Sequence, residues 1–201
     1  MRRVIDTHGH LCDRRFDKDR EAAITRAHEA GVRGFVEIAY APGILPKAHA
    51  LAAQHPNVWL CVGIHQRSAL EDTFAMLEAA RPSAGGVLHC FDDGPAAVER
   101  AHALGFKLGL GGVLTYGHAE LDEAVRTAPA GMLMLETDAP YLEPEPRSLR
   151  RNEPALLPRV LKRLCDLRGW TPEEAIRITT ANARDLFRVP FGDTAPTVTP
   201  D

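Results

Sequence analysis

The sequence lacks the features that are typical of zinc ribbons, disulfide-rich proteins, membrane proteins and proteins that coat nucleic acid. Its 201 residues include four cysteines but no CxxC pair, which argues against a zinc ribbon and a disulfide framework. No apolar run reaches the roughly 18 residues of a transmembrane helix, and the first residues contain no apolar signal core. The net charge of -3 argues against a generally basic surface that coats nucleic acid. We therefore expect a cytoplasmic globular protein with free thiols and no membrane association.

The glycine-rich fingerprint that binds dinucleotide phosphates is also absent after the first apolar run. What the chain does have is an alternation of strand-like apolar runs and amphipathic helical stretches. The predicted strands cover residues 3–8, 32–40, 57–65, 85–91, 106–114 and 131–140. Such an alternation predicts parallel strands with helices outside, in either a doubly wound sheet or a barrel.

Polar residues at the ends of the predicted strands favour the barrel, because barrel active sites lie at the carboxyl ends of the strands. His8 and His10 end the first strand, and two residues at this spacing on a strand point to the same side. The other strand-end residues of this kind are His65, His89 and Asp138. Histidine and aspartate ligands with room left for water are typical of a catalytic divalent metal site.

A lone histidine is more often a core or surface residue than a ligand, so the remaining five are interpreted as surface residues. They are His28, His49, His55, His102 and His118. Glu136 shares the parity of Asp138 on the last strand, so it is expected to orient the metal ligands. Arg67 follows His65 by two residues and could bind phosphate or form a surface salt bridge. Asn152 follows the basic stretch "RSLRR", which could contact an anionic substrate or only solvent.

Four segments of the chain resemble the TatD family of metal-dependent deoxyribonucleases. These are "DTHGHLCD" (6–13), "GGVLHCFDD" (85–93), "MLMLETDAPYLEP" (132–144) and residues 151–187, which begin "RNEPALLPRV". The resemblance implies a TIM-barrel-like α/β fold, one or two divalent metal ions (Mg, Mn or Zn) and hydrolysis of phosphodiester bonds in DNA. It also implies that the metal ligands are His8, His10, His65, His89 and Asp138. From the residues themselves, we further expect Asp138 and Arg67 to act in catalysis and Arg67 and Asn152 to bind substrate.

One departure from the family pattern lies in the middle of the chain. The family places "GIHPH", then a strand "GEIGLDY", then "IHSR", whereas this chain runs from "VWLCVGIH" directly into "QRSALEDTFAML". A central block is therefore missing, with a join at or near Ile64–His65, and the glutamate of that block is lost. Glu37 is the nearest acidic candidate to replace it, although an ordinary buried or surface role is favoured for this residue. The expected fold is a barrel truncated to about six strands.

The shortened barrel leaves three alternatives open. The chain is a metal-dependent deoxyribonuclease, a catalytically impaired remnant that still binds metal, or a hydrolase of another amidohydrolase type, since a barrel and a metal do not fix the substrate. We expect one catalytic domain over residues 1–189 and a mobile tail over 190–201. A bare parallel edge near the join would either be covered by the following helix or pair with a second copy as a homodimer.

Overall fold

Strands and helices alternate along the chain in its computed structural model, as the sequence predicts. The structure describes residues 4–41, 43–62, 74–75, 77–79, 85–147 and 151–188. The strands are β1 (Val4–Gly9), β2 (Val32–Ala39), β3 (Val58–Val62), β4 (Gly86–Leu88), β5 (Phe106–Leu110) and β6 (Leu133–Leu135). The α-helices are α1 (Arg20–Glu29), α2 (Leu45–Gln54), α4 (Pro95–Ala103), α5 (Ala119–Thr127), α6 (Leu157–Arg168) and α7 (Pro172–Phe187). The 3-10 helices are η1 (Arg14–Phe16), η2 (Gly112–Tyr116), η3 (Ala130–Met132) and η4 (Pro154–Leu156).

Some of the sequence predictions fall outside the described residues. These are the sites assigned to His65 and Arg67, the join at Ile64–His65 and the tail over residues 190–201. Residues 74–75 and 77–79, which belong to the helix predicted after the join, are helical. No helix in the described part of the chain combines the length and apolar character that crossing a membrane requires.

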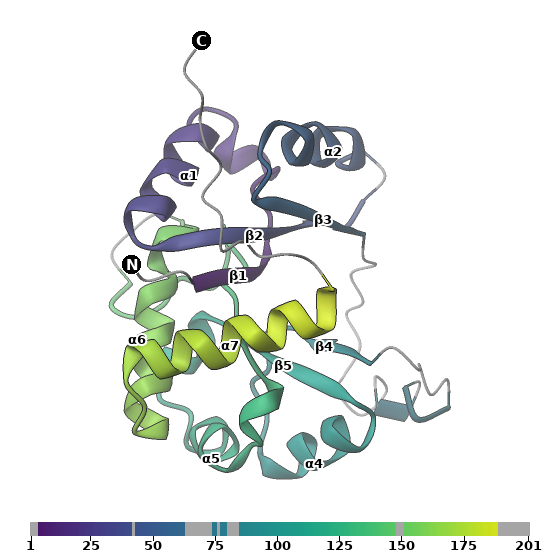
Figure 1. Cartoon of the computed structure of the whole chain (residues 1–201), viewed down its shortest axis with the longest axis vertical. Helices are drawn as coiled ribbons and strands as arrows, with labels where there is room; N and C mark the ends of the chain where they lie inside the picture. The colour runs from purple at the N-terminus through teal and green to yellow at the C-terminus, as the bar shows by residue number, and fades with distance from the viewer. Residues whose placement is uncertain are drawn as a thin grey trace.

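The strands form two parallel three-stranded sheets, ordered β1-β2-β3 and β4-β5-β6. The two sheets meet where β1 and β6 lie side by side. Thr7 Oγ1 donates to the Leu135 carbonyl at 3.0 Å, and the Asp138 amide donates to the His8 carbonyl at 2.9 Å. The strands therefore follow the order β3-β2-β1-β6-β5-β4, and β3 and β4 each have one sheet neighbour within the described residues. This is a six-stranded member of the TIM-barrel-like folds, with helices covering its outer side (Figure 1).

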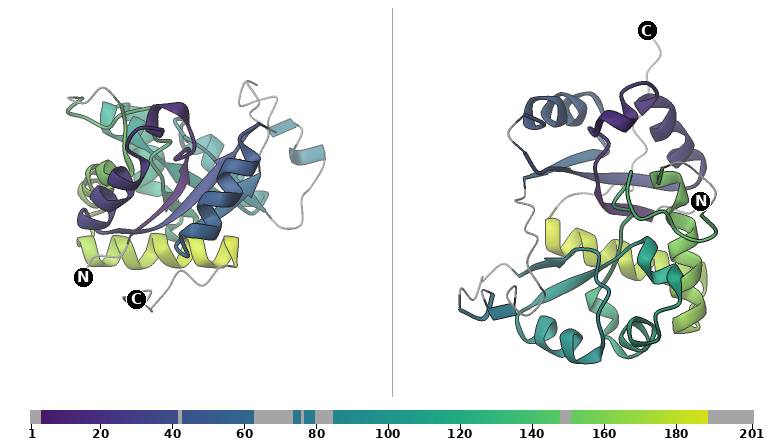
Figure 2. Two further views of the ribbon diagram at one scale, coloured as in Figure 1. Left: turned by 90° about the horizontal axis from the view of Figure 1, so that it is seen from above. Right: turned by 180° about the vertical axis from the view of Figure 1, so that it is seen from behind.

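Two apolar clusters fill the space on the two sides of the strands. The larger cluster joins alternate strand residues, such as Leu133 and Leu135 of β6, to the helices that cover the sheets. The smaller cluster contains the intervening residues, such as Met134, together with residues of α7. Helix α7 lies along the region where the two halves of the molecule meet (Figures 1 and 2). The strands thus have an outer face under helices and an inner face from which Met134 and, two residues later, Glu136 project.

A break in strand pairing sets the direction of the first site residue. Ile5 packs in the inner cluster with Val36 and Met134. In a regular strand, His8 would point to the opposite face, because it lies three residues after Ile5. The pairing of β1 with β2 shifts register between Asp6 and Gly9, and such an irregularity changes which face the following side chains take. His8 therefore reaches the inner side of the barrel.

Local residue types account for two helix ends. Thr171 caps α7: its side chain accepts from the Glu174 amide at 3.2 Å, and Glu174 accepts from the Thr171 amide at 2.8 Å. After α1, Gly31 takes a φ of 94°, the left-handed conformation that a side chain disfavours. Both ends thus have a local chemical cause.

The fifth predicted strand is shorter than expected. Residues 111–114 were assigned to this strand, but β5 ends at Leu110 and a 3-10 helix begins at Gly112. A Cβ at Gly112 would collide with the Leu142 carbonyl oxygen, so the loop after β6 crosses closely over this glycine. The tertiary contact, which an apolar run of sequence cannot reveal, therefore ends the strand.

Candidate metal centre

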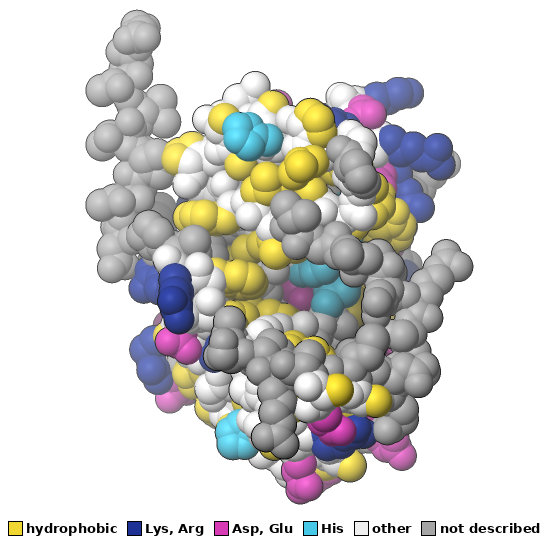
Figure 3. Space-filling view, turned by 90° about the vertical axis from the view of Figure 1, so that its right-hand side faces the viewer, with side chains coloured by type: hydrophobic (Ala, Val, Ile, Leu, Met, Phe, Trp, Pro, Cys, Tyr) yellow, Lys and Arg dark blue, Asp and Glu magenta, His cyan; other side chains and the backbone are white. Residues whose placement is uncertain are grey.

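Three strands bring the polar side chains of the candidate site together. His8 lies on β1 and His10 just beyond it, His89 follows β4, and Glu136 and Asp138 follow β6. All five therefore come from the carboxyl ends of strands, where catalytic residues of barrels lie. Histidine and acidic side chains are visible in a hollow on the face that shows the β3 and β4 side of the molecule (Figure 3).

Asp138 is the centre of this cluster. Its Oδ1 atom lies 3.2 Å from Nε2 of His10, 3.2 Å from Nε2 of His89 and 3.7 Å from Nε2 of His8. Three imidazole nitrogens from two different strands thus surround one carboxylate oxygen. His10 is held in this orientation because its Nδ1 lies 3.2 Å from the carbonyl oxygen of Ile38. A backbone partner on one ring nitrogen leaves the other free to bind a metal.

Glu136 forms the floor of the site on the β6 side. Its side chain is completely buried, and its Oε1 lies 2.6 Å from Nδ1 of His89 and accepts from the Cys90 amide at 2.7 Å. Its Oε2 has no hydrogen-bond partner within the part of the chain that the structure describes. Gly109 on β5 makes room for this carboxylate, because a Cβ there would collide with Oε2. A buried, unpartnered carboxylate oxygen beside histidine nitrogens fits a site built for a cation.

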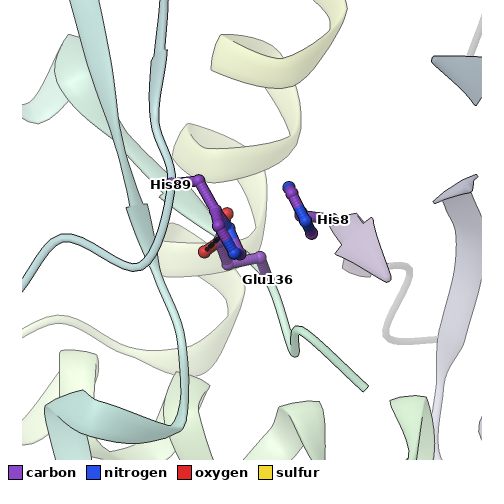
Figure 4. A group of neighbouring side chains, drawn as sticks. All are labelled: His8, His89 and Glu136. Atoms are coloured by element: carbon purple, nitrogen blue, oxygen red, sulfur yellow. Dashed lines mark ion pairs between the residues drawn. The ribbon is translucent and has the colours of Figure 1, made fainter. Parts of the chain in front are cut away.

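His8 and His89 face each other across the site with stacked rings. Their ring centroids lie 3.4 Å apart with an interplanar angle of 9°. Figure 4 shows the two rings with the Glu136 carboxylate beside His89. Burial lowers the pKa of His8 to about 3, so this ring is neutral at neutral pH. Neutral imidazole is the form that coordinates metal ions.

The two carboxylates give the centre a negative field. Burial alone would raise the pKa of Asp138, but its hydrogen bonds with His10 and His89 outweigh burial and lower it. Burial would likewise lower the pKa of His89, but Glu136 and Asp138 outweigh burial and raise it. The field therefore stabilises a positive charge at His89. A divalent cation in the same position would be stabilised for the same reason.

The donor atoms are close enough to share an ion. Within the described residues, three overlapping groups have ligand atoms that all lie within 4.8 Å of one another. The groups are His8, His89 and Glu136; His8, His10 and Asp138; and His89, Cys90 and Asp138. Nitrogen and oxygen donors from three strands, with the His89 side chain 28% exposed, fit a divalent metal that keeps an open position.

The loop after β6 is fixed by Asp6, which the sequence analysis did not select. Asp6 is 1% exposed, and its carboxylate accepts from the Thr137 amide at 2.9 Å and from the Thr137 hydroxyl at 2.5 Å. These two hydrogen bonds hold Thr137, the residue directly before Asp138. Asp138 itself adopts a left-handed φ of 56°. The signal for Asp6 was present, since a carboxylate inside an apolar strand needs buried partners.

Asn152 and Glu37 also support backbone near the site. Asn152 is 1% exposed, and its side-chain nitrogen donates to the carbonyls of Thr137 and Tyr141 at 2.7 and 2.6 Å. Its predicted contact with substrate stays a prediction. Glu37, also 1% exposed, accepts from the amides of Leu11 and Cys12 at 2.6 and 3.1 Å. Glu37 is absent from the three donor groups of the described chain, in keeping with the buried role favoured for it.

Comparisons with known proteins agree with this arrangement. The sequence model of the TatD related DNase family matches residues 5–66 and 62–188. The two matches meet at residues 62–66, where the sequence analysis places the join. The chain is 37% identical over 135 residues to the uncharacterized metal-dependent hydrolase YabD of Bacillus subtilis, covering 66% of this chain and 53% of the relative. It is 40% identical over 137 residues to the 3'-5' ssDNA/RNA exonuclease TatD of Erwinia billingiae, covering 64% and 52%.

The chain therefore spans about half the length of the curated relatives it matches. Among solved structures, it resembles YjjV, a TatD homolog from Escherichia coli K12, with a TM-score of 0.85, 24% identity and coverage of 93% of this chain and 98% of that chain. This likeness supports the fold. The family model covers most of the sequence in its two segments, and its match includes His8, His10, His89 and Asp138. The chain belongs to the TatD related DNase family of metal-dependent hydrolases.

Proposed function

We propose that the chain is a divalent-metal-dependent hydrolase that cleaves phosphodiester bonds in DNA. The observation that carries this proposal is the convergence of three imidazoles on the Asp138 carboxylate, beside the unpartnered oxygen of Glu136. The family of the chain supports the reaction class, and relatives described as 3'-5' ssDNA/RNA exonucleases support nucleic acid as the substrate.

His8, His10, His89 and Asp138 would hold the ion, together with His65 if the shortened barrel places it there. A divalent ion bound here would polarise a phosphoryl oxygen and lower the pKa of water. One or two ions are proposed. Histidine ligands favour Zn²⁺, whereas phosphate chemistry commonly uses Mg²⁺ or Mn²⁺, so all three are candidates.

The protein groups have separate tasks in this proposal. Asp138 is ionised and partly accessible, so it can accept a hydrogen bond from an attacking water and orient it. Glu136 keeps the His89 ring in place through the 2.6 Å approach to Nδ1. Arg67 is proposed to bind the phosphate with its planar guanidinium, on the evidence of the sequence alone.

The test is a nuclease assay on chelated protein with Mg²⁺, Mn²⁺ or Zn²⁺ added back. We expect at least one ion to restore cleavage of single- or double-stranded DNA and expect chelation to abolish it. A panel of amide and lactone substrates, run in parallel, checks the alternative amidohydrolase-type reaction. Turnover of a panel substrate without DNA cleavage, or no turnover with any ion, contradicts the proposal.

A second candidate function is a remnant that binds metal without hydrolysis. The observation that favours it is the meeting of the two family matches at residues 62–66, together with the half-length coverage of the relatives. The two candidate functions differ in a measurable way. A remnant binds an ion tightly and stoichiometrically but cleaves no substrate at any ion concentration. Metal content and cleavage rate measured on one sample separate the two candidates.

A further inference from the structure

One donor group of the candidate centre contains a thiol. Cys90 forms one of the three donor groups with His89 and Asp138, and their ligand atoms lie within 4.8 Å of one another. Within the described chain, the other cysteines lie outside these groups: Cys12, Cys61 and Cys165. Cys90 is half-buried.

Local backbone geometry explains how two neighbouring residues face one site. On a strand, His89 and Cys90 would point to opposite faces. Strand β4 ends at Leu88, and Cys90 adopts a φ of 49°, a left-handed conformation that is uncommon for a residue with a side chain. This conformation breaks the alternation. Strained backbone of this kind is typical of functional sites, where the surrounding structure maintains it.

The buried carboxylate of Glu136 maintains the left-handed backbone conformation of Cys90. Its Oε1 accepts from the Cys90 amide at 2.7 Å, so the position of the cysteine is tied to the floor of the site. Its Oε2 remains without a hydrogen-bond partner among described residues, although the side chain is completely buried. This second observation points to a cation independently of the thiol.

We propose that Cys90 supplies a thiolate ligand to this centre together with His89 and Asp138. The inference rests on the metal site of the proposed function and adds a ligand to it. Because thiolate is a soft donor, the centre prefers Zn²⁺, Co²⁺ or Cd²⁺ to Mg²⁺.

The test is absorption spectroscopy of the full chain loaded with Co²⁺ alone. A thiolate ligand produces a sulfur-to-cobalt charge-transfer band in the near ultraviolet, and this readout is independent of activity. We expect the band in the wild type and in Cys165→Ala, the control that removes a thiol on α6. We expect Cys90→Ser to lose the band and to bind Zn²⁺ at least about tenfold more weakly, the lower end of the loss seen for residues that only orient ligands.

Co²⁺ bound stoichiometrically to the wild type without the band overturns the inference, as does a band that persists in Cys90→Ser. If that variant fails to fold, X-ray absorption of the Zn²⁺-loaded wild type decides: a sulfur neighbour supports the inference and only nitrogen and oxygen neighbours overturn it. DNA cleavage measured on the same samples keeps the two proposals apart. DNA cleavage without the charge-transfer band contradicts only the proposed thiolate ligand. The band without DNA cleavage contradicts only the proposed phosphodiesterase activity.

Discussion

The seam between β1 and β6 differs sharply from the outer strands β3 and β4. At the seam, Asp6 of β1 accepts hydrogen bonds from Thr137, just after β6, and Asn152 in turn donates to the carbonyls of Thr137 and Tyr141. At the other side, β3 and β4 each have one sheet neighbour in the described chain, and Trp59 on β3 is half-buried. The hydrogen bonds that join the two sheets therefore lie where most of the candidate ligands are.

This difference indicates how a shortened barrel can keep a site. His8, His10 and Asp138 lie at the seam, and β4 adds His89. The join predicted from the sequence follows β3 in the chain, and β2 separates β3 from β1 and the seam. The seam ligands His8, His10 and Asp138 lie together in the shortened chain. Association of two copies through the β3 side stays a prediction, which light scattering over a concentration series can check.

The largest effect is expected from removing the central carboxylate of the seam. Asp138→Ala takes away the oxygen around which the three imidazoles gather, so cleavage should fall by at least about 100-fold, more than is typical for residues that only orient metal ligands. Metal-supported cleavage rates of purified protein measure this. His118→Ala is the control, because this residue lies outside the donor groups, and equal losses in both variants would disprove the assignment.

Gly109→Ala should disturb the floor of the site from β5. The new methyl group collides with Glu136 Oε2, so we expect a loss of about 1–3 kcal/mol in the free energy of unfolding and weaker metal binding. Urea unfolding and metal titration measure the two effects. Gly131→Ala is the matched control, because its Cβ would meet no atom within 4 Å. Equal losses of stability in the two variants would show that the close approach of Glu136 does not require a glycine at position 109.

Asn152→Ala should destabilise the seam by about 1–2 kcal/mol, because one buried and one partly buried hydrogen bond are lost. Asn57→Ala is the comparison at the start of β3, where the side chain bonds to His28 and to the Arg33 carbonyl near the surface. We expect a change of less than about 0.5 kcal/mol there, as for surface substitutions. Denaturant midpoints of both variants measure the difference, and a larger loss for Asn57 would reverse the comparison.

The smallest effect is a pH dependence at Asp19, directly before α1. The hydrogen bond from Arg151, with help from Arg26, lowers the pKa of Asp19 to about 2 from 3.8. A lowered folded-state pKa stabilises the fold above pH 3.8, and this contribution disappears as the pH falls toward 2. The gain is below about 1 kcal/mol because the Asp19 side chain is 35% exposed and solvent screens the pair.

Thermal melting between pH 5 and pH 2 measures this contribution. This interval covers both the ordinary pKa of Asp19, 3.8, and its lowered pKa of about 2 in the folded chain. We expect Asp19→Asn to flatten part of the acid-side decrease in melting temperature. Asp166→Asn, which removes an exposed ion pair within α6, controls for loss of a single negative charge. The same flattening in the control would show that net charge, and not the bond to Arg151, is responsible.

Much of the fold followed from local patterns, whereas the finer parts of the site depended on tertiary contacts. The six strands were found from apolar runs, because this signal is local. The truncation of the fifth strand was not found, because Leu142 causes it from a distant loop. Cys90 was overlooked because strand alternation places it opposite His89, and only the left-handed backbone shows otherwise.

The central claim is that the strand ends of β1, β4 and β6 form one metal centre, and amide hydrogen exchange with and without Zn²⁺ tests it directly. The account predicts that Zn²⁺ slows exchange together at residues 8–13, 89–91 and 136–142, in the three segments that carry His8, His89 and Asp138. Protection of one segment alone, or bound Zn²⁺ with unchanged exchange in all three, would contradict the claim.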